Sequence, residues 1–203
     1  AQAVQCSADG QYKLGAWIRD SMAGIGTITF WDPQSGVFGA LGHGINDVDT
    51  AQLMPLQSGS ILYSYVADVK KGEKGEPGEL KGAFQVNRDL GELYANTPGG
   101  VFGTLSDSSF LPDVQPVEVA SRDEVHTGAA VIRSNVAGDA VEEYTVEITR
   151  MFPQNGEDTR NLMLKVTDKR LLEATGGIVQ GMSGSPILQD GKLVGAVTHV
   201  LVN

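Results

Sequence analysis

Short β-type segments separated by turn residues constrain the fold of this chain more than any other feature. Two hairpins are clear: residues 26–31 and 37–41 flank an Asp-Pro-Gln-Ser-Gly turn, and residues 185–189 and 192–200 flank Asp190-Gly191. Glycine supplies 26 of the 203 residues, nearly double the average share of about 7%. Further strands are expected at residues 60–69, 83–87, 101–105, 114–120, 129–132, 143–150 and 162–166, and short helical turns at residues 47–53 and 168–173.

A turn signal every 8 to 12 residues or so is typical of a β-sandwich or a β-barrel. About a dozen strands in a chain of this length favour two packed barrels over one. We therefore predict an all-β double barrel with few short helices, its halves covering approximately residues 11–110 and 111–203.

Composition excludes several classes of function. The chain has 15 Lys and Arg against 25 Asp and Glu, a formal net charge of -10, which argues against nucleic acid as the main partner because phosphate binding needs clustered cations. No apolar run approaches the roughly 18 to 20 residues that span a bilayer. Cys6 is the one cysteine, so an intramolecular disulfide and a multi-cysteine zinc site are both excluded.

The segment Gly181-Met-Ser-Gly-Ser-Pro186, which leads into an apolar strand, carries the clearest chemical signal. A serine nucleophile needs a tight turn that exposes its hydroxyl and directs main-chain amides to the same spot, and the glycines permit such a turn. The amides of Gly181 and Ser183 would then form an oxyanion hole. A plain glycine turn is the alternative. The nucleophile elbow of α/β-hydrolases fits poorly, because Ser185 holds its fifth position and a proline and a strand follow where a helix should open.

A serine nucleophile needs a general base, and the chain has three histidines. His43 lies between two glycines just after the first hairpin, so its ring is accessible, although a surface-loop histidine is the alternative. His126 is expected to be solvated, and His199 either is buried or lines the substrate cleft. The order His43 then Ser183 is that of chymotrypsin-fold proteases. Several aspartates lie between them, and spacing does not choose a third member.

Four longer strings carry a family resemblance. They are YKLGAWIRDSMAGIGTITF at residues 12–30, FGALGHGINDVDT at 38–50, TGGIVQGMSGSPI at 175–187 and VGAVTHV at 194–200. From about Gln11 to the C-terminus the chain closely resembles the sporulation stage IV B peptidases, serine proteases of endospore-forming bacteria with a chymotrypsin-like core.

The resemblance implies a set of site residues. His43 matches the catalytic histidine of the family and Ser183 its nucleophile. The proposed triad aspartate of the family lies 15 residues before the serine, which is Asp168 here, with Asp47 and Asp49 as alternatives. Asp168 could instead cap the helical turn that follows it. A triad of this kind needs neither a metal nor an organic cofactor.

Substrate contacts are expected on both sides of the nucleophile turn. The strand after the last hairpin is placed to pair with an extended peptide by β-augmentation, and the segment before the turn to line the pocket for the residue preceding the scissile bond. The residues concerned are Val197, Thr198, His199, Thr175, Gly176 and Gly177.

The resemblance also implies a biological role. Such proteases act outside the cytoplasm, between the two membranes around the forespore, where they cleave a regulator of an intramembrane protease, trigger late sigma-factor activation and process themselves. Members usually carry a membrane anchor and a PDZ domain, and we expect this chain to be the protease domain without them. The alternatives are a non-catalytic peptide-binding module of protease-like fold and a general quality-control protease of trypsin-like fold.

Overall fold

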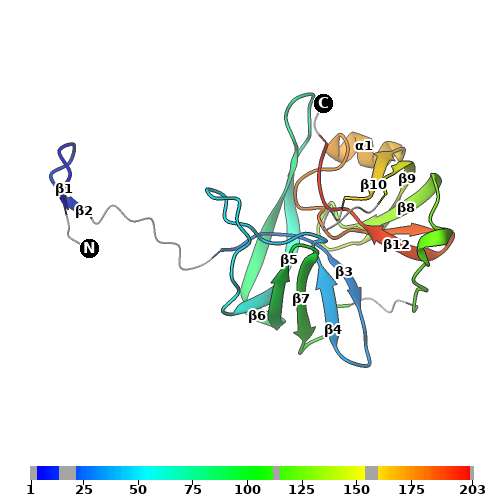
Figure 1. The fold of residues 1–203 in the computed structure, drawn as a ribbon, viewed down its shortest axis with the longest axis horizontal. Coiled ribbons are helices and arrows are strands. Elements are labelled where there is room, and N and C mark those ends of the chain that lie inside the picture. Colours follow the sequence, from blue (N-terminus) through cyan, green and yellow to red (C-terminus); the bar gives the residue numbers. More distant parts are fainter. Residues whose placement is uncertain (1–3, 14–21, 112–114, 154–159, 202–203) are drawn as a thin grey trace.

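Two five-stranded antiparallel sheets build the body of the protein (Figure 1). The computed structural model describes residues 4–13, 22–111, 115–153 and 160–201. The first sheet has the order β3-β4-β7-β6-β5 and the second the order β10-β9-β8-β11-β12. This architecture confirms the prediction of an all-β, chymotrypsin-like fold.

The strands of the two sheets follow one another along the chain. The first sheet contains β3 (Ile28–Trp31), β4 (Val37–Ala40), β5 (Gly59–Lys70), β6 (Glu79–Thr97) and β7 (Gly100–Leu105). The second contains β8 (Gly128–Ser134), β9 (Glu142–Met151), β10 (Leu162–Val166), β11 (Pro186–Gln189) and β12 (Lys192–Ala196).

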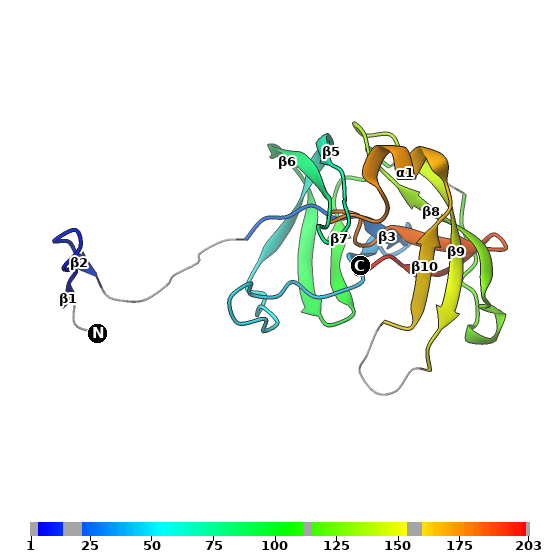
Figure 2. The ribbon, with the colours of Figure 1, turned by 90° about the horizontal axis from the view of Figure 1, so that it is seen from above.

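Three small elements complete the described structure. A hairpin of β1 (Val4–Gln5) and β2 (Tyr12–Lys13) lies apart from the body, and a 3-10 turn, η1, covers Arg122–Glu124. The helix α1 (Lys169–Thr175) lies over the second sheet in the view from above (Figure 2). Within the ranges that the structure describes, no helix is long and apolar enough to cross a membrane.

Alternation of side chains explains why the second sheet forms where it does. Along β9, Tyr144, Val146 and Ile148 are buried while the residues between them are exposed, the period of two expected for a strand with one face on a core. These residues pack with Ile132 and Ile187 in the larger core, and the smaller core of the first sheet is built on Phe38, Ala40 and Val101. The described sequence therefore forms two apolar centres.

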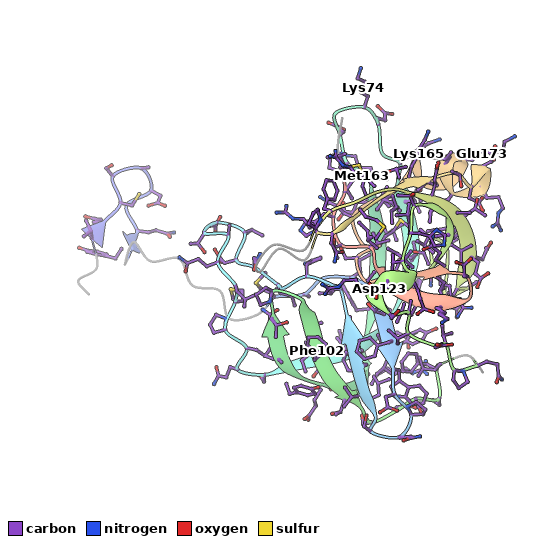
Figure 3. All side chains as sticks on the ribbon, turned by 45° about the vertical axis from the view of Figure 1, so that its right-hand side comes forward. Lys74, Phe102, Asp123, Met163, Lys165 and Glu173 are labelled. Carbon is purple, nitrogen blue, oxygen red and sulfur yellow. The ribbon has the colours of Figure 1, made fainter. Side chains whose placement is uncertain are left out.

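The β5–β6 hairpin joins the two halves. Leu80, at the start of β6, is buried in the core of the second half, and its amide donates to the carbonyl of Gln180. The amide of Gly72 donates to the carbonyl of Thr175, which lies at the end of α1. The tip of the hairpin, marked by Lys74 in Figure 3, extends beyond this contact.

Several local predictions differ from the structure. β6 runs from Glu79 to Thr97 and so includes far more than the expected residues 83–87. Residues 115–120 form no strand, although Val119 makes an isolated parallel bridge to Leu193; Val114 lies outside the described residues. No helix covers residues 47–53, where Asp47 instead binds the amides of Asp49 and Thr50 and stabilises a turn. β12 ends at Ala196, earlier than expected.

Candidate active site

The structure brings His43 and Ser183 together from the two halves of the protein. His43 follows β4 and Ser183 precedes β11, 140 residues apart, yet His43 Nε2 lies 3.0 Å from Ser183 Oγ. Both side chains are partly buried. A nucleophile and a base in direct hydrogen-bond contact are the minimum that acyl transfer by a serine requires.

The backbone turns sharply to deliver His43. Leu41 and Gly42 both have left-handed dihedrals, with φ of 68° each. A non-glycine residue in this region costs about 1 to 2 kcal/mol, and such strain gathers at functional sites. The turn directs the imidazole away from the end of β4 toward the second half.

The hydrogen bonds of the imidazole fix its tautomer. His43 Nδ1 lies 2.9 Å from the carbonyl oxygen of Gly44. A carbonyl oxygen can only accept, so Nδ1 carries the proton and the neutral ring presents the lone pair of Nε2 to the Ser183 hydroxyl. The carbonyl oxygen of Thr198 lies 3.3 Å from Ser183 Oγ and is a second acceptor. The nearer of the two acceptors is the imidazole.

The turn around Ser183 has the backbone that the glycines predict. Gly181 and Gly184 have φ of 94° and 91°, and a side chain on Gly184 would overlap the backbone of Thr27 and Leu41. The amides of Met182, Gly184 and Ser185 donate to main-chain carbonyls. Those of Gly181 and Ser183 donate to no acceptor in the described part of the chain, which leaves two donors beside the nucleophile.

No hydrogen bond or ion pair among the described residues joins Asp168 to His43, and Asp168 instead contacts α1 and β9. It is the N-cap of α1, where its carboxylate accepts from the amide of Arg170 at 2.9 Å and forms an ion pair with the Arg170 guanidinium at 2.9 Å. It also accepts from the amide of Thr145. The Arg170 hydrogen bond, which outweighs the effect of burial, lowers the pKa of Asp168 to about 2. The carboxylate is therefore committed to α1, and the imidazole of His43 has the Gly44 carbonyl as its Nδ1 partner.

Thr175 also has a different place from the one expected. Its side chain is fully buried, and its hydroxyl lies 2.8 Å from the carbonyl oxygen of Leu171 and 2.6 Å from that of Gly177, the two acceptors available to its one proton. A buried side chain cannot contact a bound peptide, so Thr175 instead fixes the loop that contains Gly176 and Gly177.

The other expected contact residues line a cavity that reaches Gly42 and Thr198, although neither His43 nor Ser183 lines it. The cavity has a volume of about 1220 Å³ and is lined by Gly176, Gly177, Val197, Thr198 and His199, among others. Phe102 on β7 and Met163 on β10 also line it, so it extends between the two sheets (Figure 3). The His199 ring lies 5.5 Å from the His43 ring, measured between centroids, whereas His126 is exposed and contacts Asp190.

Sequence reasoning did not find the residues that surround the histidine loop. Asn96 on β6 binds both the amide and the carbonyl of Ile45, at 2.9 and 2.8 Å, and the carbonyl of Met54 at 2.9 Å. A lone asparagine in a strand belongs to no motif, and a main-chain carbonyl such as that of Gly44 leaves no trace in residue type. Neither had a signal that reading the sequence could detect.

Comparison with known proteins agrees with the geometry. The comparisons with curated proteins and with solved structures found no match. The family model described as SpoIVB peptidase S55 matches residues 10–203, nearly the whole chain. The chain therefore belongs to the SpoIVB peptidase S55 family and is a serine peptidase, a hydrolase.

Proposed function

We propose that this peptidase is a selective endopeptidase of sporulation signalling, with His43 as general base and Ser183 as nucleophile. The observation that carries the chemical part is the 3.0 Å contact between His43 Nε2 and Ser183 Oγ. Membership of the family supports the biological part: cleavage of a protein that restrains an intramembrane protease, self-processing, and action between the two forespore membranes.

The chemistry follows from the positions of the hydrogen atoms. Nε2 of His43 takes the Ser183 proton while Oγ bonds to the scissile carbonyl carbon, and the amides of Gly181 and Ser183 stabilise the oxyanion. The protonated imidazole gives its proton to the departing amine as the C–N bond breaks. Water, activated by the same imidazole, then releases the acyl group and restores Ser183.

The substrate runs through the cavity between the sheets in this proposal. Thr198 and His199 lie beside the extended peptide, whereas Val197 is buried and its amide and carbonyl are already bonded to Ser185 and Gly184. The carbonyl of Thr198, which approaches Ser183 Oγ, places this segment next to the scissile bond. Gly177 leaves room at the cavity wall, since a Cβ there would meet nothing within 4 Å, whereas Gly176 packs against the carbonyl of Gly72.

The first test replaces two neighbouring serines. Ser183→Ala should abolish peptide cleavage and labelling by a serine-directed fluorophosphonate, because loss of a triad-type nucleophile costs about 10⁴- to 10⁶-fold in kcat. Ser185→Ala is the matched control: Ser185 is fully buried and binds Ser134, so labelling should persist. Labelled peptide mapped by mass spectrometry decides the site, and labelling of the Ser183→Ala protein would refute the assignment.

The second test addresses the biological part. A signalling protease should cut few sites in a peptide library and should leave unfolded casein largely intact, whereas broad cleavage would favour a quality-control protease. Self-processing should yield new N-termini that are absent for Ser183→Ala. In an endospore-forming bacterium, the same substitution should silence a reporter for late sigma-factor activity, and a normal reporter signal would contradict the signalling role.

A further inference from the structure

The orientation of the catalytic imidazole has an unusual source in this protein. We propose that the main-chain carbonyl of Gly44 orients His43 and that Asn96 is the positioning residue that holds this carbonyl; the proposal rests on the peptidase function above. The site is then a serine–histidine dyad completed by a peptide group, and no carboxylate of the described residues binds the imidazole.

The first step of the argument is the hydrogen bond on Nδ1. In a serine triad, the acid fixes the tautomer that leaves Nε2 free to accept the serine proton. Here the Gly44 carbonyl, 2.9 Å from Nδ1, imposes the same tautomer. Being neutral, the carbonyl orients the ring but stabilises an imidazolium less than an ionised carboxylate does.

The second step is the link from this carbonyl to Asn96. The Gly44 carbonyl and the Ile45 N–H belong to one planar peptide unit, which is trans because no cis peptide bond occurs among the described residues. Asn96 Oδ1 accepts from that N–H at 2.9 Å, while its Nδ2 donates to the carbonyls of Ile45 and Met54. In a trans peptide unit the N–H and the C=O lie in one plane and point in opposite directions. A hydrogen bond that holds the Ile45 N–H therefore also fixes the direction of the Gly44 carbonyl.

The third step is the support behind the loop. Gly44 is buried, and a Cβ on it would lie 2.7 Å from the carbonyl oxygen of Thr97. The loop therefore lies directly on the end of β6, beside Asn96. Asp168, which was expected to hold the imidazole, instead accepts hydrogen bonds from Arg170 and Thr145. The histidine loop is thus held in place by the hydrogen bonds of Asn96 and by packing of Gly44 against the end of β6.

Three variants test the proposal through kcat per active site, with sites counted by fluorophosphonate titration. Asn96→Ala should lower kcat by about 10²-fold, the cost of roughly 1 Å of misplacement, with little change in KM. Asn87→Ala, exposed on the same strand, should have no effect. Asp168→Asn should leave kcat per site unchanged although the protein is less stable. A purely structural role for Asn96 would reduce the number of titratable sites and leave the rate of each unchanged.

Two kinetic results would overturn the proposal. A loss of about 10⁴-fold in kcat for Asp168→Asn, the loss seen when a triad acid becomes an amide, would return the orienting role to Asp168. An unchanged kcat per site for Asn96→Ala would remove Asn96 from the site. If Ser183→Ala itself stays active, the peptidase assignment fails instead, and the two failures are thereby distinguished.

A spectroscopic measurement tests the orientation without any turnover. In ¹⁵N-histidine-labelled Ser183→Ala protein above pH 8, the ring nitrogens of His43, assigned by comparison with a His43→Gln variant, should show the proton on Nδ1. The additional Asn96→Ala change should give a mixture of tautomers. A proton on Nε2 in the Ser183→Ala protein would contradict the Gly44 hydrogen bond and overturn the proposal.

Discussion

At the scale of single residues, the absence of a side chain at position 44 allows the catalytic loop to reach its place. A Cβ there would meet both the Thr97 carbonyl, at 2.7 Å, and the side chain of Leu53. The first of these neighbours is backbone and cannot rotate away. Gly44 is therefore required by close approach, and its own φ is not in the left-handed region.

We predict that Gly44→Ala lowers kcat by about 10²-fold, because the loop must move away from β6 and take the imidazole with it. Gly24→Ala is the control, since a Cβ there meets nothing within 4 Å. Steady-state kinetics with titrated sites is the measurement. Full activity of Gly44→Ala would show that the loop tolerates the shift and that its contact with Thr97 is dispensable.

Some site residues could be predicted from the sequence and others could not. His43 and Ser183 could be predicted as a pair because both lie in glycine-containing turns and follow the chain order of chymotrypsin-fold proteases, and the structure places their side chains in contact. Asp168 could not be decided, because separation along the chain does not say which groups the fold brings together, and Arg170 two residues away captures its carboxylate. Thr175 looked accessible beside two glycines, yet it is buried at the end of α1.

At the scale of elements, α1 depends on its cap. Asp168 binds the Arg170 amide, and Gly176 closes the other end with φ of 80°, the left-handed residue common after helices. Arg170 extends the cap by reaching Glu142, at the start of β9, at 2.9 Å. The helix is thereby tied to the second sheet by charged groups at its first turn.

A pH-dependent loss of stability follows from this cap. The pKa of Asp168 is about 2 in the folded protein, below its ordinary value of 3.8, so the carboxylate stabilises the fold above the higher value and loses that contribution as pH falls toward the lower one. Asp168→Asn should lower the urea midpoint at pH 7, and the difference from wild type should shrink as pH falls from about 4 to about 2.

The control for this experiment is Glu173→Gln, which removes an exposed carboxylate from the same helix (Figure 3). It should leave the urea midpoint close to that of wild type at each pH. If the difference in urea midpoint between Asp168→Asn and wild type stayed constant down to pH 2, the loss of stability would not come from the charge of the carboxylate.

Elements also differ in how well they could be predicted. The β3–β4 and β11–β12 hairpins were readable because turn residues separate short apolar runs. β6 was underestimated because glycines and charged residues interrupt its pattern, and pairing with β5 and β7 overrides that local signal. Residues 115–120 had strand-like composition, but only Val119 finds a bridge partner among the described residues.

At the scale of the whole molecule, the long β5–β6 hairpin couples the two halves. Gly72 and Gly78 lie back to back where the tip loop leaves β5 and enters β6, and there Gly72 contacts Thr175 and the carbonyl of Gly78 accepts from Gln180. A Cβ on Gly78 would overlap the backbone of Gly72 and Lys70 and the side chain of Val179. The junction therefore has no room for a side chain.

We predict that Gly78→Ala destabilises the protein by about 1 to 3 kcal/mol, as overpacking does in tight interiors, and separates the unfolding of the two halves. Calorimetry should show one transition for wild type and a broadened or double transition for the variant. Gly99→Ala, where the nearest atom lies at 3.9 Å, should behave as wild type. A single, unshifted transition for Gly78→Ala would argue against this coupling.

The split origin of the catalytic pair has a consequence for biosynthesis. Ser183 is synthesised 140 residues after His43, and the carbonyl of Ser183 accepts from the Thr27 amide of the opposite half. In the proposed mechanism, a nascent or half-folded polypeptide therefore lacks hydrolytic activity, because base and nucleophile meet only in the complete tertiary structure.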